Sequence, residues 1–89
     1  MRVKHLIDGK EMDSATVFET VNPATQETLA EVASGAEAEI HAAVAAAKAA
    51  FPKWAGTAQA QRARIMRRLG ELITQHVPEI AETETRDTG

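Results

Sequence analysis

Residues 16–32 read TVFETVNPATQETLAEV, and this stretch decides how the first third of the chain folds. Its opening run, 16–21, is rich in β-branched and aromatic residues and predicts a strand. Asn22-Pro23 ends that strand, because proline cannot donate a ladder hydrogen bond and biases the preceding residue toward extended geometry. Residues 23–26 then predict a turn, and the alternation over 28–32 predicts a second strand paired back across it.

Upstream of this stretch, Asp8-Gly9 separates two short apolar and polar runs, 5–7 and 10–12. A two-residue Asp-Gly loop is among the strongest local hairpin signals, since both residues tolerate positive φ. We therefore expect a β-hairpin over residues 5–12.

Downstream, the period changes from strand to helix near Ser34. Ser34-Gly35-Ala36-Glu37 fits a capping box and predicts the start of a helix. Phe51-Pro52 is expected to stop it, because proline interrupts a helix interior. Its apolar residues recur on one side of the helix: Ile40, Ala43, Val44, Ala47 and Phe51.

Two more helices follow. Thr57 is expected to cap the second, and Pro78 suits the first position of the third. The second helix is strongly amphipathic, with Arg64, Arg67, Arg68 and Glu71 opposite an apolar stripe of Ile65, Met66, Leu69, Leu72 and Ile73. Residues 87–89 are expected to form a loop.

The fold class is therefore α/β, with short strands over about 4–33 and three amphipathic helices over about 35–87. Eighty-nine residues allow one small domain at most. Eighteen of the hydrophobic residues are Ala, so the core is thin. Because strands this few and helices with one-sided stripes need a covering surface, residues 1–89 read as part of a larger domain.

Composition excludes several classes of function. The net charge of −3 and pI near 5.5 argue against a nucleic-acid module. The absence of Cys excludes disulfides, thiolate metal sites and a cysteine nucleophile within these residues. No apolar run is long enough to span a membrane, and Met1–His5 leads into a strand rather than a signal peptide. We expect a cytoplasmic protein.

Few residues suggest chemistry of their own. His5, His41 and His76 lack the spacing of a metal site, and surface positions explain them better. The five glycines lie too far apart to cradle a phosphate. A late group of carboxylates is better explained by a solvated helix face than by acid–base catalysis. That group is Glu79, Glu82, Glu84 and Asp87.

Two further features also favour a structural interpretation. The arginines at 62, 64, 67 and 68 form the densest charge cluster, which an Arg67–Glu71 helix pair is expected to neutralise in part. Trp54 is expected to fill the junction between the first two helices.

The order of these signals resembles the aldehyde dehydrogenase superfamily. The stretch 16–32 is similar to the family's N-terminal strand, which ends in Asn-Pro-Ala-Thr-Gly-Glu. Gln26 departs from that pattern, where the family has Gly, and suggests a less demanding turn. The resemblance continues over nearly the whole chain, through residues 42–51, 62–69 and 82–89. Residues 33–40, 50–55, 66–70 and 77–81 are most similar to members that oxidise semialdehydes in bacterial breakdown of aromatic compounds.

The resemblance implies a longer enzyme, roughly five times this length, that oxidises an aldehyde to a carboxylate with NAD or NADP, and these residues form an incomplete piece of its Rossmann-like cofactor-binding domain. In that family the cysteine nucleophile, the asparagine oxyanion donor, the glutamate base and the cofactor contacts lie downstream. The resemblance therefore assigns no catalytic or cofactor-binding residue to positions 1–89, and it implies a partner in the rest of the same chain and a homo-oligomer when complete.

One family site does reach this far. Several members bind a monovalent cation through oxygens at the Thr-(Val/Ile) pair before Asn-Pro, which corresponds here to Thr20 and Val21. Hard oxygen ligands suit such an ion. A plain strand end is the alternative interpretation of these two residues. For the chain as a whole, the alternative is a stand-alone helical module that binds other proteins.

Overall fold

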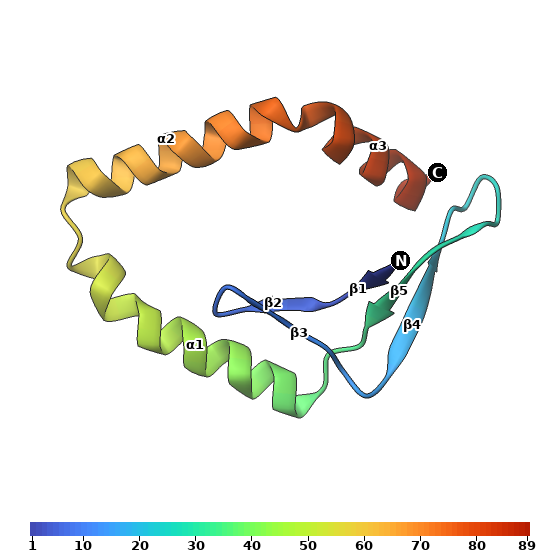
Figure 1. Ribbon diagram of the computed structural model, residues 1–89, viewed down its shortest axis with the longest axis horizontal. Coiled ribbons are helices and arrows are strands. Elements are labelled where there is room, and N and C mark those ends of the chain that lie inside the picture. The colour runs from blue at the N-terminus through green and yellow to red at the C-terminus, as the bar shows by residue number, and fades with distance from the viewer.

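The computed structural model describes every residue from Met1 to Gly89 and shows short strands followed by three helices (Figure 1). The strands are β1 (Arg2–Val3), β2 (His5–Ile7), β3 (Lys10–Met12), β4 (Val17–Val21) and β5 (Thr28–Ala33). The helices are α1 (Glu37–Ala55), α2 (Gln59–Gln75) and α3 (Val77–Thr88). The predicted α/β class and the order of strands before helices are confirmed.

Strands β2 and β3 form the predicted hairpin, with His5 opposite Met12 and Ile7 opposite Lys10. Asp8 and Gly9 have φ of 54° and 70°. Two consecutive positive φ values are typical of a type I′ turn, whose twist matches that of the flanking strands.

A second sheet has the order β1-β5-β4. Strands β4 and β5 are antiparallel, as the sequence predicts, and a bulge interrupts their register between Thr20 and Val21. Strand β1 pairs in parallel with β5 and was not predicted, because two residues are too few to show a pattern. Its Arg2 lies beside Glu31, which itself faces Glu19 across the β4–β5 pair, so the arginine offsets two like charges.

The turn between β4 and β5 is built around Asn22. Its side-chain Oδ1 accepts a hydrogen bond from the Ala24 N–H at 2.9 Å, and its carbonyl accepts one from the Gln26 N–H at 2.8 Å. Gln26 has φ 65°, in the left-handed region that favours glycine. The expectation of a less demanding turn at Gln26 is therefore wrong: the turn keeps the demanding conformation, and a non-glycine residue adopts it.

Helix α1 differs from its prediction at both ends. The backbone N–H of Ser34 donates to Thr16 at 2.9 Å, so Ser34 still belongs to the sheet and cannot cap the helix. The helix begins instead after Ala36, whose N–H donates to Glu39 Oε2 at 3.2 Å. At the other end, Pro52 lies inside the last turns and the helix continues to Ala55. Pro52 lacks the N–H that would bond to the Lys48 carbonyl, and the helix continues for only three residues beyond it.

The boundaries of α2 and α3 also shift. Thr57 Oγ1 donates to the Lys53 carbonyl at 2.7 Å and so closes α1 rather than capping α2, which starts after Ala58. His76 separates the two helices, and Pro78 is the second residue of α3 rather than the first. Helix α3 runs to Thr88, so a loop over 87–89 is wrong for all but Gly89, which has φ 89°.

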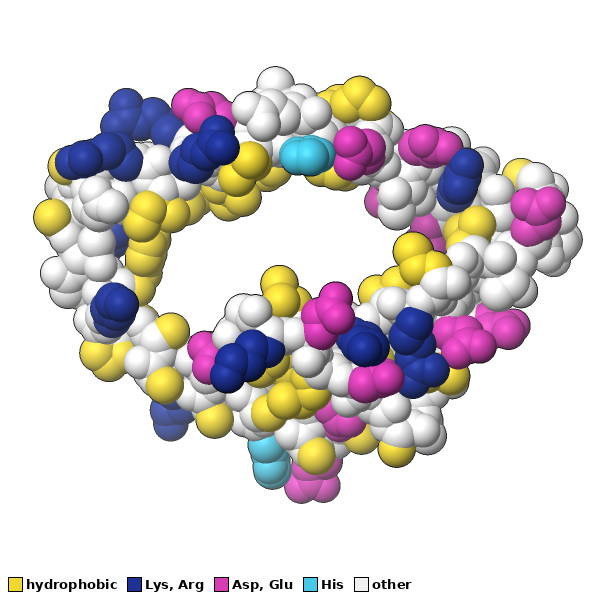
Figure 2. Space-filling model, in the orientation of Figure 1, with side chains coloured by type: hydrophobic (Ala, Val, Ile, Leu, Met, Phe, Trp, Pro, Cys, Tyr) yellow, Lys and Arg dark blue, Asp and Glu magenta, His cyan; other side chains and the backbone are white.

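The three helices form an arc whose far end returns to the sheet, and an open space remains inside the ring (Figure 1; Figure 2). The Cα radius of gyration is 16.7 Å, whereas a compact chain of this length would have about 12 Å. Only Ala30 and Ala33, both in β5, are buried. The apolar stripes of the helices remain exposed, as the one-sided pattern predicts. No helix combines the length and the apolar character needed to cross a membrane.

Candidate functional site

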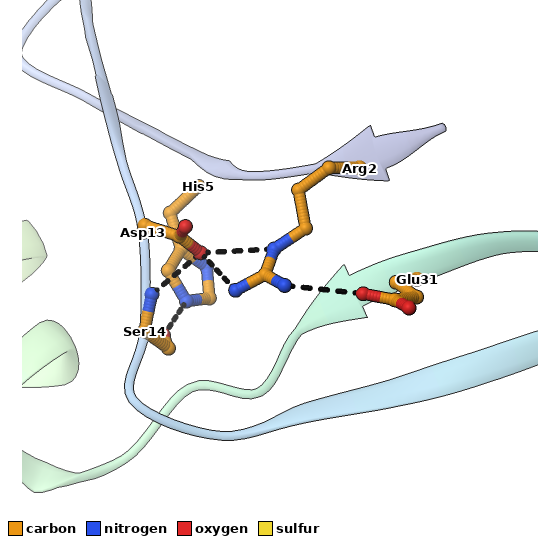
Figure 3. Close-up of polar contacts among 5 residues, drawn as sticks. All are labelled: Arg2, His5, Asp13, Ser14 and Glu31. Atoms are coloured by element: carbon orange, nitrogen blue, oxygen red, sulfur yellow. Dashed lines mark hydrogen bonds and ion pairs between the residues drawn. The ribbon is translucent and has the colours of Figure 1, made fainter.

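A polar cluster joins the two sheets around Arg2 (Figure 3). Its guanidinium Nη2 donates to Asp13 Oδ1 at 2.9 Å, and Nη1 donates to Glu31 Oε2 at 3.1 Å. The hydrogen bond from Arg2 lowers the pKa of the Asp13 carboxyl, and the same bond raises the pKa of the guanidinium. The arginine thus connects β1, the segment after β3, and β5.

The second half of the cluster is a pair of side chains, His5 Nε2 and Ser14 Oγ, 2.7 Å apart. The Ser14 backbone N–H also donates to Asp13 Oδ1 at 2.9 Å. The pKa of Glu39, at the start of α1, is lowered first by its own backbone N–H and then by the Ser14 hydroxyl. The Ser14 hydroxyl therefore links β2 to the segment that follows β3.

A groove of about 320 Å³ lies between the three-stranded sheet and α3. The sheet side is mainly apolar, and the helix side carries Glu84 and Asp87. Arg86 also lines the groove, but its Nη2 is bound to Glu82 Oε1 at 2.6 Å. The remaining lining residues are Met1, Val3, Thr20, Leu29, Ala30, Val32 and Thr83.

Only one of the two predicted cation ligands lines this groove. Thr20 lines it, together with Asp87, whereas Val21 does not. The bulge between Thr20 and Val21 locally disrupts the ladder hydrogen bonds. One of the two predicted residues therefore lines the same groove as a carboxylate that the sequence analysis had assigned to a solvated helix face.

The three histidines lie in separate surroundings. His5 belongs to the polar cluster, His41 Nε2 lies 3.9 Å from Glu37, and His76 Nδ1 lies 3.2 Å from Glu79. Nowhere in the chain do three or more His, Asp or Glu side chains gather closely enough to hold a metal ion.

Two structural expectations about the helices are wrong. The partner of Glu71 is Arg68, at 3.3 Å, rather than Arg67, because the i,i+3 position brings the two side chains together on this helix. Trp54 is 41% exposed and does not fill a junction within this chain.

The polar cluster itself was missed by sequence reasoning. Asp13 lies 11 positions after Arg2 and Glu31 lies 29 positions after it, and no sequence motif relates the three residues. The only available signal was the two-residue strand that aligns Arg2 with Glu31, and that strand is too short to detect.

Comparison with known proteins gives a consistent result. The model of the aldehyde dehydrogenase family matches residues 10–89. A 5-carboxymethyl-2-hydroxymuconate semialdehyde dehydrogenase from Escherichia coli is 61% identical over 88 residues, which is 99% of this chain and 19% of that protein. Betaine aldehyde dehydrogenase 1 from Rhizobium meliloti (strain 1021) is 40% identical over 90 residues, 99% of this chain and 18% of its own length.

The fold has a solved counterpart. A crystal structure from Sinorhizobium meliloti 1021, described as a methylmalonate-semialdehyde dehydrogenase complexed with NAD, superposes with a TM-score of 0.89 at 39% identity. The match covers 97% of this chain and 18% of that one. The chain therefore spans about a fifth of the length of the proteins it resembles.

Proposed function

Because this chain belongs to the aldehyde dehydrogenase family, we propose that it forms the N-terminal strand-and-helix portion of an NAD(P)-dependent enzyme that oxidises a semialdehyde to a carboxylate. The proposed substrate is 5-carboxymethyl-2-hydroxymuconate semialdehyde, an intermediate of aromatic-compound catabolism. The observation that carries this proposal is the 61% identity to the Escherichia coli dehydrogenase over 99% of the chain. The complete enzyme is proposed to be a cytoplasmic homo-oligomer.

Within that enzyme, residues 1–89 have a structural role. Aldehyde oxidation of this kind needs an activated nucleophile, donors for the oxyanion and a base with a pKa near neutrality. This chain contains no Cys, and its glycines are dispersed. Its contribution is an outer sheet and a helical arc against which the cofactor-binding domain packs. NAD or NADP would supply the hydride acceptor and would be held by residues elsewhere in the enzyme.

The structural role can be tested with a chimera, in which this chain replaces the 88 aligned residues of the Escherichia coli dehydrogenase. We expect the chimera to fold and to reduce NAD with a semialdehyde at a rate within about tenfold of the parent, a difference of about 1.4 kcal/mol in the barrier. The 89-residue chain alone is expected to show no such activity. An insoluble or inactive chimera would contradict the proposal.

The substrate needs a separate test, because the chimera takes its catalytic residues from the relative. We expect the complete reading frame around this chain to encode a cysteine nucleophile beyond Gly89. Its product should reduce NAD faster with 5-carboxymethyl-2-hydroxymuconate semialdehyde than with betaine aldehyde. The reverse preference would replace the substrate and leave the family assignment unchanged.

We also propose a monovalent cation at the end of β4, with oxygens of Thr20 and Val21 among its ligands. The supporting observation is that Thr20, at the disrupted end of the β4–β5 ladder, lines the same groove as the Asp87 carboxylate. Carboxylate, hydroxyl and carbonyl oxygens are the donors that hard cations prefer.

The thermal midpoint of the chimera in potassium or sodium chloride, compared with choline chloride, tests the cation proposal. A cation present at ten times its Kd stabilises a protein by about 1.4 kcal/mol. We expect Asp87→Asn to remove this difference, whereas Glu79→Gln on the same helix should preserve it. Equal midpoints in all three salts would contradict a cation site.

A further inference from the structure

The turn between β2 and β3 places two groups side by side that can react with each other. It consists of Asp8 and Gly9, which are both exposed. The Asp8 side chain makes no hydrogen bond or ion pair, and the Gly9 N–H donates to no acceptor in the chain. Because the two groups belong to adjacent residues, a reaction between them is intramolecular and has a small entropic cost. The turn therefore holds a free carboxyl electrophile beside a free amide nucleophile.

The surroundings of the turn leave room for a ring to form there. A Cβ atom built on Gly9 would meet nothing within 4 Å. Asp8 borders a hollow of about 270 Å³ beside α1, whose wall on the helix side consists of alanines. Since glycine has no side chain to shield its nitrogen, the amide can approach the neighbouring carboxyl closely. Ring closure at this position meets no steric obstacle from the chain.

The hairpin is also a part of the molecule that can open locally. Strands β2 and β3 have three residues each and form a sheet of their own (Figure 1). A two-stranded hairpin is only marginally stable by itself, and such elements open without global unfolding. Opening releases Asp8 and Gly9 from their positive φ values, so that the Gly9 nitrogen can reach the Asp8 carboxyl carbon.

The other two aspartates are in less reactive surroundings. Asp13 Oδ1 accepts hydrogen bonds from Arg2 Nη2 and from the Ser14 N–H, both at 2.9 Å. Arg2 also lowers the pKa of Asp13, which favours the ionised carboxylate, a poorer electrophile than the neutral acid. Asp87 lies within α3 and precedes Thr88, whose β-branched side chain is bulky and stiff. Asp8 is therefore the aspartate with the fewest restraints.

We propose that Asp8 is a site of spontaneous isoaspartate formation. In the first step the Gly9 nitrogen bonds to the Asp8 Cγ, the bond from Cγ to one carboxyl oxygen breaks, and that oxygen leaves as water with the amide proton and the carboxyl proton. The product is a succinimide. Water then adds to the former α-carbonyl of the ring, and the bond from that carbon to the nitrogen breaks. The chain afterwards runs through the β-carboxyl group, with no net gain or loss of atoms or electrons.

The modification would change the hairpin itself. An isoaspartyl residue adds one carbon to the backbone of a two-residue turn whose geometry sets the register of His5 opposite Met12. Ser14 follows two residues after Met12, and its Oγ lies 2.7 Å from His5 Nε2. A displaced β3 therefore moves Ser14 away from His5, so that a reaction at the turn weakens the polar cluster at the opposite end of the hairpin.

The experiment uses the product of the complete reading frame that contains this chain, incubated for several weeks at neutral pH. Peptide mapping with mass spectrometry distinguishes isoaspartate from aspartate at each position. We expect at least about tenfold more isoaspartate at Asp8 than at Asp13 or Asp87, a difference of about 1.4 kcal/mol in the barrier. A synthetic peptide of residues 4–13 gives the rate without the folded protein.

Two variants of the same turn test the route. Asp8→Asn keeps the preferred turn residues and forms the same succinimide with loss of ammonia, so we expect a change of mass at this position and a faster reaction. Asp8→Glu keeps the charge but would have to form a larger ring, and we expect no detectable isomerisation. Hydrogen exchange over residues 5–14 should be faster in the isomerised protein than in the unmodified protein.

The outcomes decide both parts of the inference. If position 8 stays unmodified in the protein, whether or not the peptide reacts, or if Asp13 reacts as fast as Asp8, the proposed site is overturned. If the isomerised protein exchanges as slowly as the unmodified protein, the link from the turn to the polar cluster is overturned. None of these results depends on the substrate, so the proposed function is tested separately.

Discussion

Residues 1–36 and the arm formed by helices α2 and α3 are held in their conformations by different kinds of contact. In residues 1–36, two sheets, a bulge, an Asn-based turn and the Arg2 cluster connect segments far apart in sequence, and the buried Ala30 and Ala33 lie there. In the arm, the bonds are local to each helix and no residue is buried. The first region is defined by its own contacts, whereas the second leaves its apolar side chains exposed.

The largest effect expected from this difference concerns the apolar stripe of α2, which includes Ile65 and Leu72. We expect the double change Ile65→Ala and Leu72→Ala to destabilise the chimera by about 4 kcal/mol or more, since burial of such residues is worth 2–5 kcal/mol each. In the isolated chain the same change should cost less than about 1 kcal/mol, because both side chains are already 37% or more exposed. Urea unfolding of the two proteins measures both values.

Equal losses in the two proteins would contradict this prediction, because the arm would then pack within the chain itself. An isolated chain that unfolds as a monomer in two states, with stability above about 5 kcal/mol, would have the same consequence and would favour the independent helical module.

The contrast between the two regions also explains how much could be predicted from sequence. The hairpin at Asp8-Gly9 and the β4–β5 pair follow from local turn chemistry, and the helices follow from periodicity. Helix ends were predicted less well: Ser34 remains in the sheet ladder, and Pro52 is accommodated inside α1. The Arg2 cluster and the groove that Thr20 and Asp87 both line depend on tertiary contacts, which no local pattern encodes.

A second prediction tests the sheet side of the comparison. Ala33 is 4% exposed in β5, opposite Val17 of β4. We expect Ala33→Leu to destabilise the protein by about 1–3 kcal/mol through overpacking. Because the surrounding sheet belongs to this chain, the loss should occur in the chimera and in the isolated chain alike.

Hydrogen exchange of the β4 and β5 amides provides the measurement in the isolated chain. Ala38→Leu, at an exposed position near the start of α1, is the matched control and should leave exchange unchanged. If Ala33→Leu destabilised only the chimera, the sheet would also depend on contacts with the rest of the enzyme.

A smaller effect is expected at the turn. Gln26 adopts φ 65° and its side-chain Nε2 donates to the Pro23 carbonyl at 3.0 Å. Gln26→Gly removes the left-handed strain of roughly 1–2 kcal/mol, while the greater freedom of glycine in the unfolded chain costs about 0.5–1 kcal/mol. Gln26→Gly also loses the side-chain hydrogen bond, worth about 0.5–1.5 kcal/mol, so we expect its urea midpoint to stay close to that of the unmodified protein. Gln26→Ala, which keeps the strain but loses the hydrogen bond, should lower that midpoint.

The smallest effect is expected at the Arg2 cluster, where the groups are partly exposed and the contribution depends on pH. Arg2 lowers the pKa of Asp13 in the folded protein. Asp13 therefore stabilises the fold above its ordinary pKa of about 3.9, and this contribution is lost as the pH falls through the lower, folded-state value. We expect Asp13→Asn to lower the urea midpoint of the chimera at neutral pH and to flatten its decline in acid. Glu11→Gln, which removes an exposed carboxylate of the same sheet region, should leave the pH profile unchanged. Parallel profiles for the unmodified chimera and Asp13→Asn would show that the cluster does not stabilise the junction of the two sheets.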